Sequence, residues 1–137
     1  MHRFMRRLRR SGAFTLVELM IVVVIVAILA MVAVPLYQAN VTAAKMSEGI
    51  AGVGSIRTSM RVYAAQHDGS YPTLSAVAGS ALTTIGVSAT DLDGKYFDAD
   101  DYTVTATATT YSITATLGSE TYIINQDGAE SGTFTTE

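Results

Sequence analysis

The longest apolar stretch of the chain lies near its N-terminus. No side chain is polar over residues 19–34, and only Thr15 and Glu18 are polar between residues 14 and 35. At a rise of about 1.5 Å per residue, a helix over this stretch is about 33 Å long, close to the roughly 30 Å hydrocarbon core of a bilayer. The pattern therefore predicts a hydrophobic helix over residues 14–36 that can span a membrane.

An amphipathic pattern follows and predicts that the helix continues over residues 37–68. Apolar residues recur at intervals of three and four, which is typical of one buried face of a helix. These residues are Ala44, Met46, Ile50, Val53, Ile56, Met60, Tyr63 and Ala64. The helix is predicted to end at His67, Asp68 and Gly69, where turn-forming residues begin.

Three glycines interrupt this amphipathic helix, namely Gly49, Gly52 and Gly54. Each glycine costs about 1 kcal/mol relative to alanine in a helix interior, so packing must hold the stretch in a helical conformation. Either strands approach the helix closely at the glycines, or the glycines form a flexible joint.

The C-terminal half predicts a connecting region and then a sheet. Residues 69–101 contain turn signals without a long period, with one short helix near Leu74 to Val77. From residue 102 to residue 137, apolar residues alternate with threonines, and turn signals separate the runs. We therefore expect an α+β fold in which three or four antiparallel strands cover the apolar face of the helix.

Charge is distributed unevenly along the chain. Five of the nine basic residues lie in the first thirteen positions, which contain no acidic residue. The formal net charge is −3 for the whole chain, and the remaining four basic and twelve acidic residues give −8 for residues 14–137. The positive-inside rule places the N-terminus in the cytoplasm and the C-terminal domain outside it. An acidic domain also disfavours nucleic-acid binding, because it repels phosphates.

The residue types exclude several kinds of site. The chain has no cysteine and two histidines, so it has neither disulfides nor a zinc-thiolate cluster. His67 lies beside Asp68, but no serine or cysteine nucleophile motif accompanies them. We predict that the chain is not an enzyme and needs no cofactor.

The stretch Gly12-Ala13-Phe14-Thr15-Leu16-Val17-Glu18-Leu19-Met20-Ile21-Val22-Val23 resembles the cleavage and methylation signature of the type IV pilin family. If Phe14 is the first residue of the mature chain, Glu18 is the fifth and Pro35 the twenty-second, positions where the family carries glutamate and proline. The resemblance implies that prepilin peptidase removes residues 1–13 as a leader and that Phe14 is then N-methylated.

The cleavage point departs from the family pattern in one respect. Ala13 stands where the family usually has glycine, and Gly12 lies one position earlier. Cleavage after Gly12 would shift Glu18 to the sixth position, out of register with the pattern. We therefore expect cleavage between Ala13 and Phe14.

Glu18 and Pro35 are the residues expected to act in assembly. A carboxylate inside an apolar segment is costly without a cationic partner, and the new amine of Phe14 would supply one. The resemblance implies that the amine of an incoming subunit meets the glutamate of a neighbour and sets the register of a filament. Pro35 has no N–H for the carbonyl of Met31, so it loosens the helix, and we hypothesise local unwinding there in the fibre.

The resemblance implies a structural subunit of a pilus that serves adhesion, motility or uptake. The precursor is expected in the bacterial inner membrane, in contact with lipid, prepilin peptidase and the assembly platform. The mature chain is then expected in a homo-oligomeric helical filament on the cell surface. The alternatives are a pseudopilin of a type II secretion system, a minor pilin, or a secreted binding domain whose signal peptide is cut near Ala30 or Ala43.

An acidic cluster in the connecting region is a weak candidate for calcium. It contains Asp91, Asp93, Asp98, Asp100 and Asp101. Carboxylate oxygens suit Ca²⁺, but the spacing lacks the twelve-residue loop of an EF-hand and its terminal glutamate. A solvated acidic loop is the alternative that we favour.

Overall fold

The computed structural model describes residues 13–134 of the chain. Two units are distinguished by their contacts, and the division falls between Ala39 and Asn40. One continuous helix, α1 (Leu16–Gln66), passes through both units. The helix ends directly before His67, as the sequence predicts. It continues without a break through Pro35.

The first unit consists of the N-terminal part of α1. Its large apolar side chains are exposed, from 51% for Ile25 to 78% for Met31, and no part of its most apolar stretch is buried. Among the described residues, α1 is the one helix that is long and apolar enough to cross a membrane. This segment has no protein core of its own, which is the property expected of a helix that meets lipid or other helices.

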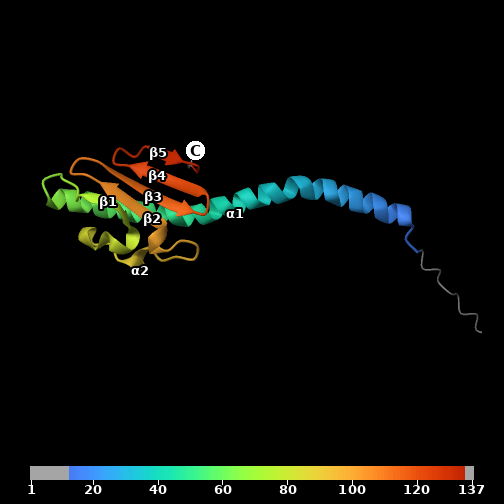
Figure 1. The fold of residues 1–137 in the computed structure, drawn as a ribbon. Coiled ribbons are helices and arrows are strands. Elements are labelled where there is room, and N and C mark those ends of the chain that lie inside the picture. The colour runs from blue at the N-terminus through green and yellow to red at the C-terminus, as the bar shows by residue number, and fades with distance from the viewer. Residues whose placement is uncertain (1–12, 135–137) are drawn as a thin grey trace, which may run out of the picture. The chain divides into compact units, whose positions relative to one another are not determined.

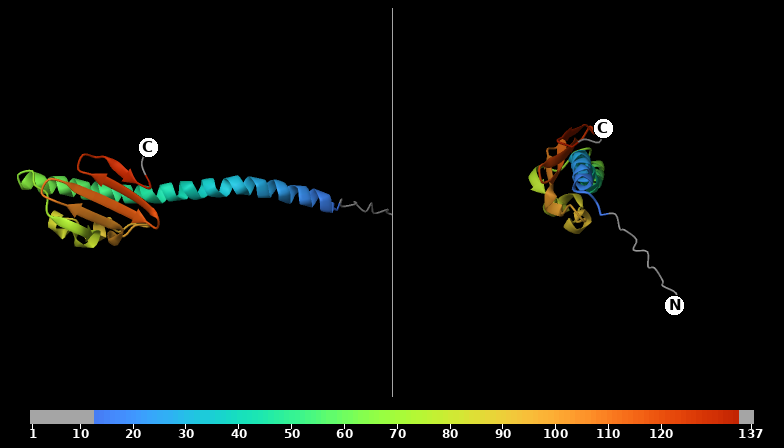
Figure 2. Two further views of the ribbon diagram at one scale, coloured as in Figure 1. Left: turned by 45° about the horizontal axis from the view of Figure 1, so that its top comes forward. Right: turned by 90° about the vertical axis from the view of Figure 1, so that its right-hand side faces the viewer.

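The second unit combines the rest of α1 with a five-stranded antiparallel sheet (Figure 1). The strands are β1 (Leu74–Ala78), β2 (Tyr102–Ala106), β3 (Tyr111–Leu117), β4 (Glu120–Asn125) and β5 (Glu130–Gly132). They follow one another across the sheet in chain order. Figure 2 shows the strands running obliquely across this part of α1. The predicted α+β fold is confirmed, with five strands where the sequence predicts three or four.

The core lies between α1 and the inner face of the sheet. The buried helix residues are Met46, Gly49, Val53, Ile56, Met60 and Ala64, which repeat at intervals of three and four. Every second residue of the central strands faces them, so that Val104 pairs with Ile113 and Ile113 pairs with Ile124 in the sheet register. The alternating threonines lie on the other face. Ala44 is exposed, although the sequence pattern placed it on the buried face.

The connecting region is more ordered than the sequence predicts. It contains β1, the 3-10 helix η1 (Gly79–Ile85), α2 (Ala89–Leu92) and a second 3-10 helix, η2 (Ala99–Asp101). The predicted short helix near Leu74 is wrong, because these residues pair with β2 as an edge strand that contains an irregularity before Val77. Pairing with a distant strand overrides weak local preferences.

Two strand boundaries lie where the alternating pattern itself does not mark them. β2 ends at Ala106, because residues 107–110 form a turn. In this turn the Thr107 N–H donates to the Thr110 carbonyl at 2.8 Å. The last strand, β5, lies at residues 130–132, and residues 135–137 lie outside the described part. The positions of turns depend on hydrogen bonds that the alternating pattern does not encode.

Candidate assembly site and relatives of the chain

The predicted cleavage point lies immediately before α1. Ala13, Phe14 and Thr15 are not helical and are exposed. Extended, accessible backbone is what a peptidase needs at the bond that it cuts. Gly12 and the rest of the predicted leader lie outside the described residues, so the structure describes the cleavage point only from Ala13 onward.

Thr15 and Glu18 form a capping box at the start of α1. Glu18 Oε2 accepts hydrogen bonds from the Thr15 backbone N–H and the Thr15 hydroxyl, both at 2.8 Å. In return, the Glu18 N–H donates to Thr15 Oγ1 at 3.2 Å. These bonds satisfy donors that a helix N-terminus would otherwise leave free. Thr15 was not singled out as a site residue, although its spacing of three from Glu18 is the sequence signature of this motif.

The capping box gives Glu18 neutral partners within its own helix. Its carboxylate also lies in the first turn of α1, where the helix dipole favours a negative charge. A protonated amine at Phe14 would add a cationic partner only after cleavage of the preceding peptide bond. The structure therefore shows how the glutamate is held in the precursor chain and leaves its charge available.

Pro35 lies inside α1 and is exposed. A proline in a helix removes one backbone hydrogen bond and weakens the helix locally. Its role in assembly and the unwinding of the helix in a fibre stay predictions.

The acidic cluster of the connecting region caps turns. Asp91 Oδ2 accepts from the Ser88 N–H at 3.0 Å, and Asp93 Oδ1 accepts from the Ala99 N–H at 3.2 Å. The η2 helix has a capping box, in which Asp101 accepts from the N–H of Asp98. Asp98 in turn accepts from the N–H of Asp100 at 2.9 Å. Among residues 13–134, no group of three or more acidic or histidine side chains is placed to hold a metal ion.

Glu48 is a positioning residue that the sequence did not reveal. Its Oε1 accepts from the backbone N–H groups of Tyr96 and Phe97 at 2.8 and 2.9 Å. These hydrogen bonds, the one from Tyr96 first, hold the pKa of Glu48 below its usual value. Forty-eight residues separate Glu48 from Tyr96, so only the tertiary structure reveals the contact.

Comparisons with known proteins agree with this arrangement. The family model of the prokaryotic N-terminal methylation motif matches residues 8–34. A fimbrial protein of Neisseria meningitidis is 42% identical over 83 residues, which are 61% of this chain and 45% of that protein. The chain is thus similar to type IV pilins and carries their N-terminal methylation motif.

Two further relatives show the same similarity. The fimbrial protein EcpC of Eikenella corrodens is 38% identical over 106 residues, 77% of this chain and 62% of that protein. The type IV major pilin protein PilE1 of Neisseria gonorrhoeae is 40% identical over 83 residues, 61% of this chain and 47% of that protein. The chain spans about half the length of two of these relatives and less than two thirds of EcpC. No solved structure is a significant match. The names of the relatives are those of structural proteins rather than enzymes.

Proposed function

We propose that this chain is the precursor of a structural subunit of a type IV pilus. The observation that carries the proposal is the apolar first part of α1, which is exposed throughout and overlaps the match to the methylation motif. A folded unit of its own follows, with a buried core. Such a helix requires an apolar environment that the chain itself does not supply.

Lipid would provide that environment before assembly, and other copies of the helix would provide it afterwards. Transfer from lipid to a helix bundle does not expose apolar surface to water, so it avoids the large penalty of solvation. We propose that prepilin peptidase first removes residues 1–13 and that Phe14 is N-methylated. The assembly platform in the inner membrane would then move the subunit into a homo-oligomeric filament.

Glu18 would set the register of the subunits in this filament. After cleavage, the amine of Phe14 on one subunit can pair with the Glu18 carboxylate of a neighbour. Breaking a buried ion pair costs about 3 to 5 kcal/mol, which rejects misaligned subunits even where the pair adds little net stability. Pro35 would give the same helix a point of local weakness.

The proposed location follows from charge and hydropathy. The arginines of residues 1–13 would stay in the cytoplasm, while the folded unit lies outside it and later on the cell surface. Adhesion, motility and uptake are roles that such a filament would serve.

Mass spectrometry of the N-terminal peptide tests this proposal. Filaments sheared from intact cells and the membrane fraction should be analysed separately. We expect N-methylated Phe14 to be abundant in the sheared fraction. The same terminus confined to membranes would instead favour a pseudopilin or a minor pilin. A terminus at Ala13 would show cleavage after Gly12, and a terminus beyond Ala30 in soluble secreted protein would overturn the proposal.

A further inference from the structure

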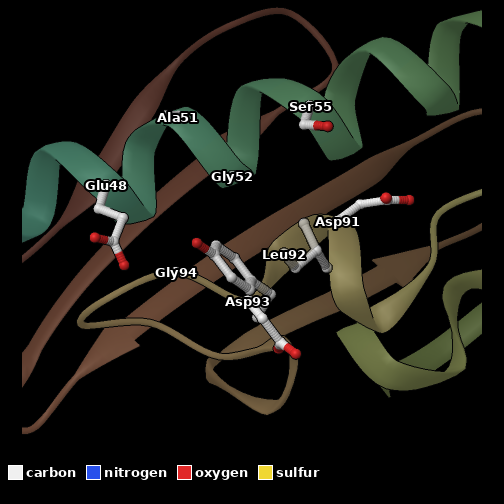
Figure 3. Close-up of a pocket in the computed structure, with 9 residues that line it drawn as sticks. Glu48, Ala51, Gly52, Ser55, Asp91, Leu92, Asp93 and Gly94 are labelled. Atoms are coloured by element: carbon white, nitrogen blue, oxygen red, sulfur yellow. The ribbon is translucent and has the colours of Figure 1, made fainter.

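A pocket of about 270 Å³ lies between α1 and the segment around α2 (Figure 3). Glu48, Ala51, Gly52 and Ser55 line it from the helix. Asp91, Leu92, Asp93, Gly94 and Tyr102 line it from the opposite side. The volume is several times the roughly 30 Å³ that a water molecule occupies in the liquid, so a side-chain head group fits.

Tyr102 directs a polar group into this pocket. Its side chain is 1% exposed, and its hydroxyl lies against Gly52, where a Cβ atom would collide with it. No described residue forms a hydrogen bond with this hydroxyl. Among the described residues, every side-chain N or O atom that is fully buried has a hydrogen-bond partner. The Tyr102 hydroxyl has none, so it must be accessible to solvent, and the pocket that Tyr102 lines provides this access. A buried tyrosine usually has a partner for its hydroxyl.

The chemistry of the pocket suits a cationic donor. Burial, together with the charges of Glu48 and Asp101, raises the pKa of Tyr102 to about 12, so the phenol stays neutral and its oxygen can accept an N–H. The Glu48 carboxylate uses Oε1 to hold two loop N–H groups, and a carboxylate has a second oxygen that can accept further hydrogen bonds.

Lysines lie near the pocket but do not fill it. The Nζ atoms of Lys45 and Lys95 lie 5.3 and 5.1 Å from the ring centroid of Tyr96, which is not a lining residue. Lys95 also interacts electrostatically with Glu48. Figure 3 shows the Asp91 and Asp93 side chains directed away from Glu48 and Gly52, so the Glu48 carboxylate is the negative charge on the α1 side of the pocket.

Arg61 is a cation without a partner among the described residues. Besides the two lysines, the only other basic residue after position 13 is Arg57, which donates to the Tyr111 hydroxyl at 3.3 Å and the Gln126 carbonyl at 3.4 Å. Arg61 is exposed. It follows Glu48 on the same helix by a distance of about 20 Å at 1.5 Å per residue, so its guanidinium cannot reach the Glu48 carboxylate of its own chain.

We infer that the Arg61 guanidinium of one subunit donates hydrogen bonds into the pocket of Glu48 and Tyr102 on a second copy of the chain. This inference rests on the proposed filament. The donor and the pocket are different surfaces of one subunit, so the contact is heterologous and can repeat from copy to copy without closing. Guanidinium is well suited to this pocket, because its planar set of donors binds carboxylates and stacks on aromatic rings.

Cross-linking of full-length chains in assembled filaments tests the contact directly. The chain has no cysteine, so Ala51→Cys at the pocket and Ala65→Cys, an exposed position one helical turn after Arg61, introduce unique thiols and keep the arginine. These positions lie about 21 Å apart on one helix, beyond the Cα separation of about 7 Å that a disulfide tolerates. A bismaleimide with a spacer of about the length of an arginine side chain spans the gap between neighbouring subunits. A spacer of this length does not join the two thiols within one chain.

We expect the double variant to give a ladder of cross-linked oligomers. A mixture of the two single variants should give dimers, and neither single variant alone should form a cross-link. If the double variant forms filaments with methylated Phe14 but no ladder above the single variants, the inference is wrong and the proposed function stands. If the wild-type chain forms no filaments, the proposed function itself fails.

Filament yield after shearing is the second test. Arg61→Gln should lower the yield about tenfold or more, because hydrogen bonds to charged groups are stronger than neutral ones. Lys45→Gln removes the same charge from the same helix and should leave the yield unchanged. Ala51→Arg should also lower the yield by filling the pocket, unlike Ala44→Arg at an exposed position outside it. A wild-type yield from Arg61→Gln, with an unchanged unfolding temperature, would refute the contact.

Discussion

Glu18 has partners of two kinds, one present in the precursor and one that processing would create. Thr15 donates two hydrogen bonds to its carboxylate, and the Glu18 N–H returns one to the threonine hydroxyl. The capping box organises the first turn of α1, whereas the proposed ion pair acts between subunits. A substitution that keeps the capping box but removes the charge separates these two roles.

Glu18→Gln is that substitution. Glutamine at this position also completes a capping box, but it carries no charge for the amine of Phe14. We expect processing to continue and filaments to be lost in Glu18→Gln as in Glu18→Ala, measured as N-terminal mass and sheared yield. If Glu18→Gln forms normal filaments while Glu18→Ala forms none, assembly requires the capping box and not the charge of the glutamate.

The aspartates clustered in the connecting region hold turns and helix starts. Asp91, Asp93, Asp98 and Asp101 each accept a backbone N–H in a turn or at a helix start. Short acidic side chains commonly hold such turns. Their clustering in sequence therefore has a local structural explanation in the succession of short elements.

The glycines of α1 differ in what surrounds them. A Cβ atom at Gly49 would collide with the ring of Phe97, and one at Gly52 would collide with the ring of Tyr102. Phe97 is 2% exposed, and its ring centroid lies 5.6 Å from that of Tyr102. Gly54 has nothing within 4 Å of the same position. Close approach, and not a flexible joint, is therefore the reason for two of the three glycines.

Gly49→Ala and Gly54→Ala form a matched pair on this helix. Gly49→Ala should lower the free energy of unfolding by about 1 to 3 kcal/mol, because the buried Phe97 ring must shift. Gly54→Ala should raise it by up to about 1 kcal/mol, because alanine favours the helix and meets no obstacle. Urea unfolding of the full chain in detergent measures both values. Equal changes in the two variants would contradict the packing explanation.

At the scale of the second unit, Glu48 joins the helix to the loop that carries Phe97. Its carboxylate holds the N–H groups of Tyr96 and Phe97, and Phe97 in turn fills the space left by Gly49. Arg57 performs a comparable role at the β4–β5 turn, where its Nη2 donates to the Gln126 carbonyl. Two charged side chains of α1 thus position loops that have no disulfide to hold them.

The stability of this unit should therefore depend on pH through Glu48. Because its pKa is lowered on folding, the stabilisation is fully present above the ordinary value of 4.5 and is lost as the pH falls through the lowered value. We expect Glu48→Gln to be less stable than wild type at neutral pH and the difference to shrink below pH 4.5. Unfolding curves at several pH values measure this difference.

Glu120→Gln is the control for that series. It removes an equal charge from β4, and the Glu120 carboxylate forms no hydrogen bond among the described residues. A pH dependence that Glu48→Gln does not alter would place the titrating group elsewhere.

Features that depend on local spacing can be predicted from the amino-acid sequence. The apolar run, the period of the amphipathic helix and the alternation of the strands each follow from side chains a few residues apart, because helices and strands repeat over short distances. The match around Phe14 and Glu18 is local as well. Thr15 belongs to the same class, because its motif with Glu18 is legible in four consecutive residues.

The tertiary structure alone decided what depends on distant pairing. β1 became a strand because β2 offers it an edge, and Gly49 became a contact point because Phe97 reaches it from a loop. Glu48 has a hydrogen-bond partner 48 residues away. Tyr102 lines the pocket because β2 places its side chain against Gly52 of α1. No local pattern encodes these contacts, since chain segments far apart in sequence meet only when the core between them is packed.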